Sequence, residues 1–317
     1  MRRLILLIVL TTSAFASSRT WEATYVARLA DIPAGIEKLD VWIPLPQSTP
    51  FQKISDVVIE SPYTFVLHRE EVWGNEYAHA AVPAPPSSIE VRVKFNVVRT
   101  EVTRDAVTGK PGDLNTALRA DRMVTLSPRV RKLADEVTAG KSSTEEKARA
   151  IYDHLVSTMT YDKVAPGWGQ GDTERACDIR KGNCTDFHSL FMSLARAKGI
   201  PSRFVIGFPL TAADGVARGY HCWAEFWLEG KGWVPVDASD ASKNAKLRDY
   251  LFGNLDAERV QFTTGRDLVL NPATAEPLNY FIYPRGEAKG QPAGVPSIAL
   301  EFKPASSQSA APVAAQP

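Results

Sequence analysis

The spacing of apolar residues changes once along this 317-residue chain, and that change limits its fold more than any other feature. Between Trp21 and about Val102, apolar side chains recur at every second position, most clearly in Ile89-Glu90-Val91-Arg92-Val93-Lys94-Phe95. Such alternation is typical of a strand with one buried face. After residue 127 the spacing becomes helical. The pattern therefore predicts a β-rich part followed by a part that contains helices.

The chain divides into five stretches on composition and pattern, and its length fits about two domains. Residues 17–102, punctuated by prolines, are expected to form a small antiparallel β-domain. Residues 103–126 show little periodicity and carry turn residues, so we interpret them as a linker. Residues 127–302 are expected to form the second domain, and the Ala/Pro/Ser/Gln-rich residues 303–317 to be disordered.

The first sixteen residues have the pattern of a secretory signal peptide. A positive start, Met1-Arg2-Arg3, precedes the apolar run Leu4–Leu10, and Ala14-Phe15-Ala16 resembles a small-residue cleavage site. The apolar run is far shorter than the roughly 20 residues of a membrane span. We expect cleavage after Ala16 and export to the periplasm or the medium, with no membrane span in the mature chain.

Composition excludes several classes of protein. Hydrophobic residues make up 44% and charged residues 23% of the chain, which is ordinary globular usage. The formal charge of +1 leaves no basic excess to neutralise phosphates, so we expect no nucleic-acid partner. Three cysteines are too few for a disulfide scaffold, and their odd number leaves at least one thiol free or paired outside the chain. Composition does not determine the oligomeric state.

Capping residues mark the helix starts. Ser127 before Pro128 predicts one helix, and Ser143 with Glu146 forms a capping box for the next. In Gly182-Asn183-Cys184-Thr185-Asp186, Asn183 is a good N-cap and Cys184 occupies the first helical position. Unpaired backbone N–H groups there stabilise a thiolate, which is the nucleophilic form of cysteine. The alternative is that Cys184 is a small buried apolar residue.

A histidine and an acid follow on two predicted strands. Gly219–Leu228 and Trp233–Asp237 are separated by the turn Glu229-Gly230-Lys231-Gly232, as in a hairpin. Sheet pairing can hold His221 beside Asp237, so that the acid fixes the imidazole tautomer and the imidazole takes a thiol proton. Two neighbours are alternatives: His188 as the base, four residues after Cys184, and Asp240 as the acid.

The order Cys184, His221, Asp237, in the settings GNCTDFHSLF, GYHCWAEF and GWVPVD, resembles the transglutaminase-like superfamily over roughly residues 120–245. The β-domain in front is similar to that of many bacterial members. The resemblance implies an α+β fold with a papain-like core, in which residues 127–302 form the catalytic domain. It assigns Cys184 as nucleophile, His221 as base and Asp237 as orienting acid, and it leaves His188 to packing around the site.

The same resemblance implies amide chemistry through a cysteine thioester. Members hydrolyse, deamidate or transfer amide groups, and we expect a peptide or protein substrate, with hydrolysis favoured. Protein-glutamine transamidation and a non-catalytic cell-envelope binding module are the alternatives. We expect no cofactor and no metal, because no acidic loop has clear calcium-ligand spacing. The Cys184 backbone N–H is expected to serve the oxyanion hole, with a second donor not identified.

The two remaining cysteines have two interpretations. On a strand, Cys222 should point to the face opposite His221, away from the cleft. An exported protein meets oxidising conditions, so a Cys177–Cys222 disulfide would leave Cys184 as the free thiol. Alternatively, Cys177 and Cys222 are both buried free thiols.

Overall fold

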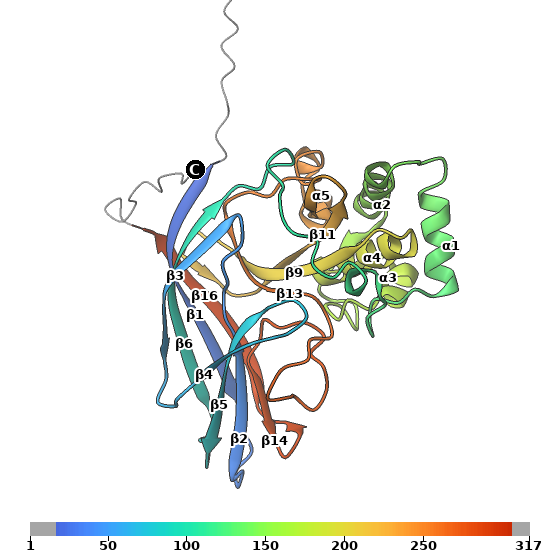
Figure 1. The fold of residues 1–317 in the computed structure, drawn as a ribbon. Coiled ribbons are helices and arrows are strands. Elements are labelled where there is room, and N and C mark those ends of the chain that lie inside the picture. The colour runs from blue at the N-terminus through green and yellow to red at the C-terminus, as the bar shows by residue number, and fades with distance from the viewer. Residues whose placement is uncertain (1–16, 306–317) are drawn as a thin grey trace, which may run out of the picture.

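The computed structural model describes residues 17–305 (Figure 1). The predicted signal peptide, residues 1–16, lies outside the described residues, as do residues 306–317 of the predicted tail. Within residues 17–305, no helix has both the length and the apolar character that a membrane crossing requires.

Two five-stranded antiparallel sheets make up the β-rich part (Figure 1). The predicted alternation in residues 89–95 belongs to one long strand of the first sheet, and within those residues the inward side chains are buried and the outward ones are charged. In order, the first sheet consists of β10 (Val216–Ala217), β16 (Val295–Pro304), β1 (Ser18–Ala30), β6 (Ile89–Thr100) and β3 (Gln52–Glu60). The second consists of β15 (Gln291–Pro292), β14 (Arg285–Ala288), β2 (Lys38–Pro44), β5 (Glu76–Pro83) and β4 (Val66–Arg69).

The last strands of the chain return to these N-terminal sheets. β16 pairs with β1 from Trp21↔Pro304 to Ala30↔Val295, and β14 pairs with β2. The sequence analysis grouped residues up to 302 with the second domain and began the disordered tail at 303, whereas β16 runs to Pro304. Alternation identifies a strand but not its partner, so this long-range pairing was not expected.

A third antiparallel sheet carries the helices. Its strand order is β12 (Gly232–Val236), β11 (His221–Leu228), β9 (Ser202–Pro209) and β13 (Arg259–Thr264). Figure 1 shows the larger helices gathered on one side of β9 and β11, with the two β-rich sheets on the other. The helices are α1 (Pro128–Val137), α2 (Thr144–Thr158), α3 (Thr173–Ile179), α4 (Cys184–Ala197) and α5 (Ala238–Lys243), with short 3₁₀ turns at Thr116–Leu118 and Ala245–Leu247. A two-stranded parallel pair, β7 (Thr160–Tyr161) and β8 (Lys181–Gly182), completes the elements.

The predicted helix starts are confirmed. The Ser127 side chain accepts from the backbone of Val130, and Ser143 and Glu146 form the expected capping box. α4 packs against β11 and β9, and buried residues from the β-rich sheets, the third sheet and the helices belong to one continuous apolar core. Antiparallel sheets with helices on one side of the third sheet confirm the predicted α+β fold.

Candidate active site

The start of α4 places Cys184 at the first helical position, as predicted. The Asn183 side chain accepts a hydrogen bond from the Thr185 backbone at 2.8 Å, and Asp186 accepts from the Asn183 backbone at 2.9 Å. Asn183 and Asp186 form a capping box, in which the Asn183 side chain also accepts from the Asp186 backbone. Cys184 itself is only 1% exposed, with its backbone N–H among the first of the helix, where partners within the helix are lacking.

Asp186 also ties a glycine-rich loop to this helix start. Its carboxylate accepts from the backbone N–H groups of Gly169 at 2.8 Å and Gly171 at 3.1 Å. A Cβ at Gly182 would lie 2.2 Å from Asp186 Oδ2, so only glycine fits there. No link between Asp186 and this loop was predicted from the sequence. This link depends on tertiary structure. The glycines at both ends of the contact, Gly169 and Gly171 in the loop and Gly182 before the helix, were the sequence signal that could have indicated a close approach.

His221 and Asp237 meet at the ends of paired strands β11 and β12. His221 Nε2 lies 2.7 Å from Asp237 Oδ2, which leaves Nδ1 as the ring nitrogen available to the Cys184 thiol. Burial alone would lower the pKa of His221, but the charges of Asp237 and Asp240, with hydrogen bonds to Asp237 and Cys184, together outweigh it and raise the pKa to about 10. The hairpin thus brings together the histidine and the acid, as the sequence analysis expected.

The Cys184 thiol lies close to His221 and Cys222, and both side chains act on its pKa. Burial alone would raise the pKa of Cys184, but hydrogen bonds with Cys222 and His221 and the charge of His221 lower it well below its usual range. The structure therefore brings Cys184, His221 and Asp237 into one chain of contacts. In this arrangement a thiolate and an imidazolium stabilise each other.

Four donors hold the Asp237 carboxylate. Besides His221, the Arg259 guanidinium donates to Oδ2 at 3.0 Å, while the Ser239 hydroxyl and the Asp240 backbone N–H donate to Oδ1, each at 3.0 Å. Burial would raise the pKa of Asp237, but the charge and hydrogen bond of His221, followed by the charge of Arg259, lower it well below the usual range. Arg259 was not predicted as part of the site, because it lies on β13, outside the three sequence blocks that pointed to the site.

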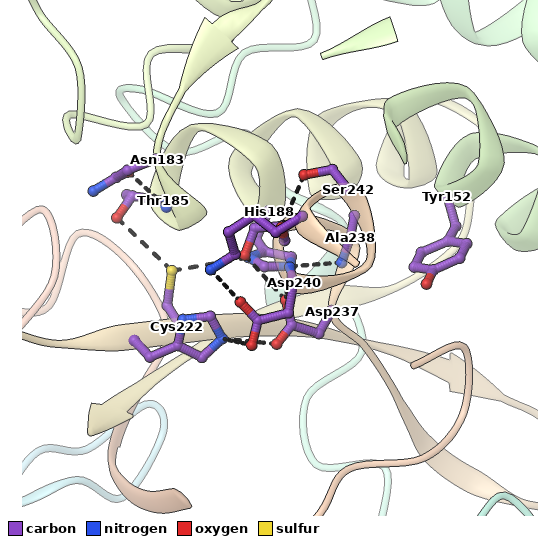
Figure 2. A network of polar contacts seen from close by, with 12 residues as sticks. Tyr152, Asn183, Thr185, His188, Cys222, Asp237, Ala238, Asp240 and Ser242 are labelled. Atoms are coloured by element: carbon purple, nitrogen blue, oxygen red, sulfur yellow. Dashed lines mark hydrogen bonds and ion pairs between the residues drawn. The ribbon is translucent and has the colours of Figure 1, made fainter. Parts of the chain in front are cut away.

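Asp240, the alternative acid, lies farther from the imidazole. Its Oδ2 is 3.5 Å from His221 Nε2, and its Oδ1 pairs with Lys243 at 2.5 Å. Figure 2 shows the carboxylates of Asp237 and Asp240 side by side. Together with His221 they offer three ligand atoms within 4.8 Å of one another, a spacing that a metal ion could use. Since Arg259 and Lys243 already neutralise the two carboxylates, we assign the group to the imidazole contact.

His188, the alternative base, has both ring nitrogens occupied. Nε2 accepts from the Ala238 backbone at 3.1 Å, which places the proton of the neutral ring on Nδ1, 3.9 Å from Cys222 Sγ (Figure 2). Burial lowers the pKa of His188 and favours this neutral form. His188 therefore links α4 to the end of β12 and to Cys222.

The three cysteines are free and buried, so the Cys177–Cys222 disulfide is not formed in this structure. The expectation that Cys222 points away from the cleft was also wrong. Cys222 Sγ lies between the Thr185 hydroxyl, at 3.8 Å, and His188 Nδ1, at 3.9 Å (Figure 2). It is also close enough to Cys184 to affect its pKa. The prediction assumed that neighbouring residues of a strand face opposite sides. It failed because His221 is the first residue of β11, and both His221 and Cys222 approach the Cys184 thiol. Burial raises the pKa of Cys222, and it raises that of Cys177 to about 11.

Tyrosines that the sequence analysis did not single out surround the thiol. Tyr161, Tyr220 and Tyr283 all have raised pKa values, first through burial and also through the charge of Cys184. The Tyr220 hydroxyl lies 2.9 Å from both Asn183 Nδ2 and Thr185 Oγ1, which fixes it against the start of α4. An aromatic enclosure of this kind excludes water from a thiolate and from a thioester formed on it.

Comparison with known proteins agrees with this geometry. Residues 131–238, which include Cys184, His221 and Asp237, match the model of the transglutaminase-like superfamily. An uncharacterized protein of Haemophilus influenzae is 29% identical over 311 residues, covering 82% of this chain and 84% of the relative. A protein-glutamine gamma-glutamyltransferase of Pseudomonas aeruginosa is 29% identical over 121 residues, which are 35% of this chain and 18% of that protein.

A solved structure shows the same fold over most of the chain. The protein is described as a "Putative Cysteine Protease" from Cytophaga hutchinsonii, and it superposes with a TM-score of 0.64 at 16% identity, covering 91% of both chains. The likeness therefore extends over the β-rich sheets as well as the helical part. The predicted α+β fold is confirmed, and residues 131–238 carry the similarity to the transglutaminase-like superfamily.

Proposed function

We propose that this transglutaminase-like protein is a cysteine enzyme that cleaves an amide or peptide bond through a thioester on Cys184. The observation that carries the proposal is the buried contact chain from the Cys184 thiol through the His221 imidazole to the Asp237 carboxylate. A thiolate at a helix start, a base beside it and an acid that orients the base are the parts that nucleophilic acyl chemistry needs.

In the first half-reaction the Cys184 thiolate attacks the amide carbonyl carbon. The negative charge moves to the carbonyl oxygen, which the Cys184 backbone N–H stabilises. As the tetrahedral intermediate collapses, the C–N bond breaks and the protonated His221 gives its proton to the leaving amine. The products of this step are a thioester on Cys184 and a free amine, with His221 left neutral.

In the second half-reaction His221 works in the opposite direction. It takes a proton from a water molecule as that water attacks the thioester carbonyl, and the C–S bond then breaks to release a carboxylic acid and Cys184. Asp237 holds the imidazole in position and favours its charged form in both steps.

Alkylation of Cys184 by iodoacetamide, mapped by mass spectrometry across pH, tests the proposal. Because Cys184 is buried, the pH at which the rate falls reports on its pKa better than the rate does. We expect reaction to persist well below the unperturbed value of about 8.5 and the profile to move to higher pH in His221→Ala. Matching profiles in the two proteins, both centred near the unperturbed value, would contradict an activated nucleophile, and the binding-module alternative would then be preferred.

Protein-glutamine transamidation is the second candidate, and the similarity to the Pseudomonas aeruginosa transferase favours it. The first half-reaction is then the same, but a primary amine attacks the thioester instead of water. A glutamine peptide incubated with and without a primary amine distinguishes the two. Hydrolysis converts the glutamine to glutamate in both samples, whereas transfer gives the amine-linked peptide at the expense of the glutamate product.

We also propose that the chain is exported, on the basis of the signal-peptide pattern in residues 1–16. N-terminal sequencing of the protein recovered from a periplasmic or secreted fraction is expected to start at Ser17. A chain that retains Met1 and stays in the cytoplasmic fraction would contradict export.

A further inference from the structure

An arginine occupies an inward position of strand β6, where the alternation of apolar and polar residues predicts an apolar side chain. Inward side chains of this strand are Ile89, Val91, Val93, Phe95 and Val97, all buried, and the next inward position is Arg99. Arg99 is only 2% exposed and belongs among the largest fully enclosed side chains. A buried guanidinium is expensive unless charged or polar groups compensate it.

Among the described residues, no hydrogen bond or ion pair is made to the Arg99 guanidinium. Its Nε is buried without a hydrogen-bond partner. The acids that attract it, Glu225 and Asp256, act only at a distance, and each is already paired: Glu225 with Arg203 at 2.6 Å and Asp256 with Arg259 at 2.7 Å. Burial, followed by repulsion from Arg259, lowers the pKa of Arg99 to about 10. The Arg99 guanidinium therefore keeps an N–H donor that no described residue accepts.

Arg99 lines a cavity of about 200 Å³ between the β-rich sheets and the far face of the third sheet. Arg203 and Glu225, which neutralise each other, lie on one wall, so Arg99 supplies the uncompensated charge. Apolar walls come from Phe51 and Trp233, and the Trp233 indole is fixed by a bond from Nε1 to the Lys110 carbonyl at 3.2 Å. The cavity is therefore positive, partly apolar and held in shape.

We propose that this cavity binds a small organic carboxylate, with the Arg99 guanidinium as its main partner. A guanidinium presents parallel N–H groups that match the two oxygens of a carboxylate. The resulting ion pair is strongest where water is excluded. At about 30 Å³ per water-sized group, the volume of about 200 Å³ holds about six or seven such groups, so the ligand is a short-chain acid or the carboxyl end of a peptide. The proposal is independent of the chemistry at Cys184, because the cavity lies apart from the thiol.

Titration calorimetry on the full chain, at constant ionic strength, tests the site. The probes are sodium propionate, for a free acid, and the tripeptide Gly-Gly-Ala with a free or an amidated carboxyl end, for a peptide source. We expect saturable binding of propionate or of the free tripeptide, and none of the amidated one. Whichever of the two binds more tightly identifies the source of the carboxylate. No saturable heat with either probe would overturn the proposal.

Arg99→Met removes the guanidinium and keeps most of the apolar stem. Loss of a charged hydrogen-bonding partner is expected to weaken binding by about 10- to 100-fold. Arg92→Met is the matched control, since Arg92 lies on the same strand but faces outward and pairs with Glu301 at 2.5 Å. Equal affinity in the Arg99 and Arg92 variants would overturn the assignment.

A measurement on the unmutated protein covers the case in which Arg99→Met fails to fold. The ¹⁵N–¹H signal of the Arg99 Nε–H group, assigned by comparison with Arg99→Lys, is expected to shift on addition of the bound probe. A shift confined to other arginines would place the carboxylate elsewhere and refute the site.

Discussion

At the scale of single residues, the decisive feature is that each oxygen of the Asp237 carboxylate accepts hydrogen bonds from its own pair of donors. Oδ2 serves His221 and Arg259, while Oδ1 serves Ser239 and the Asp240 backbone. The carboxylate is therefore held on both sides, and the imidazole bound to it cannot rotate without losing its partner. Asp240 has no comparable set of donors, and this difference separates two acids that the sequence alone leaves as alternatives.

Asp237→Asn is expected to reduce amide turnover by about 10³-fold, because the amide fixes the imidazole less well and no longer favours its charged form. Asp240→Asn is the matched control and should cost less than about 10-fold, since its carboxylate lies 3.5 Å from the ring. Steady-state rates on one peptide substrate measure both. Equal losses in the two variants would show that the acids share the role.

The raised pKa of His221 predicts where activity ends on the alkaline side. His221 must be protonated to give a proton to the leaving amine, so turnover should fall as pH rises through about 10. Asp237 raises this pKa, and its removal must therefore move the alkaline limb to lower pH. The residual activity of Asp237→Asn, measured from pH 7 to 11, is expected to show that shift; an unmoved limb would mean that another group sets it.

At the scale of elements, the start of α4 depends on one buried carboxylate. Asp186 receives three backbone N–H groups, from Gly169, Gly171 and Asn183, and so joins a loop to a helix end. The loop stands close to the Tyr220 hydroxyl, since a Cβ on Gly169 would lie 3.5 Å from it. The position of Cys184 therefore depends on contacts outside its own helix.

Asp186→Ala is expected to lower the free energy of unfolding by about 2–4 kcal/mol, because it leaves three backbone donors without an acceptor. Asp178→Ala, which removes only an exposed carboxylate paired with Arg129, should change it by less than about 1 kcal/mol. Urea denaturation followed by circular dichroism measures both. A loss for Asp186→Ala no greater than that of the control would show that water replaces the carboxylate.

Elements were predictable from sequence wherever the signal is local. The alternation of residues 89–95, the Ser143–Glu146 capping box and the Asn183 N-cap each depend on neighbours a few residues apart, and all three are present. Arg259, the tyrosines and the place of Cys222 were missed or wrong, because each depends on which strand lies beside which. The approach of His221 to Asp237 was predictable because a short turn joins their strands.

At the scale of the whole molecule, the β-rich sheets and the helical part are joined by their buried side chains. Leu300 on β16 is completely buried and belongs to the same apolar core as Phe191 on α4. The segment between β9 and β11 of the third sheet also joins the β-rich part, since its strand β10 pairs with β16. Such sharing of a core favours unfolding as one cooperative unit.

Leu300→Ala is expected to destabilise the protein by about 2–5 kcal/mol through the cavity that it leaves. If the molecule unfolds as one unit, loss of β-structure and exposure of Cys184 to iodoacetamide should share one midpoint in denaturant. Ser297→Ala, an exposed change on the same strand, should leave that midpoint in place. Two separate midpoints would show that the sheets and the helical part unfold independently.

The pairing of β1 with β16 also determines the order in which the chain can fold. These are the first and last strands of the described residues, and β1 lies between β6 and β16 in its sheet. One edge of β1 therefore stays open until Val295–Pro304 has been synthesised, and closing so long a loop is slow. During that interval the open edge can pair with another chain and aggregate. A nascent chain of this protein thus needs either a chaperone on that edge or a delay in folding until synthesis is complete.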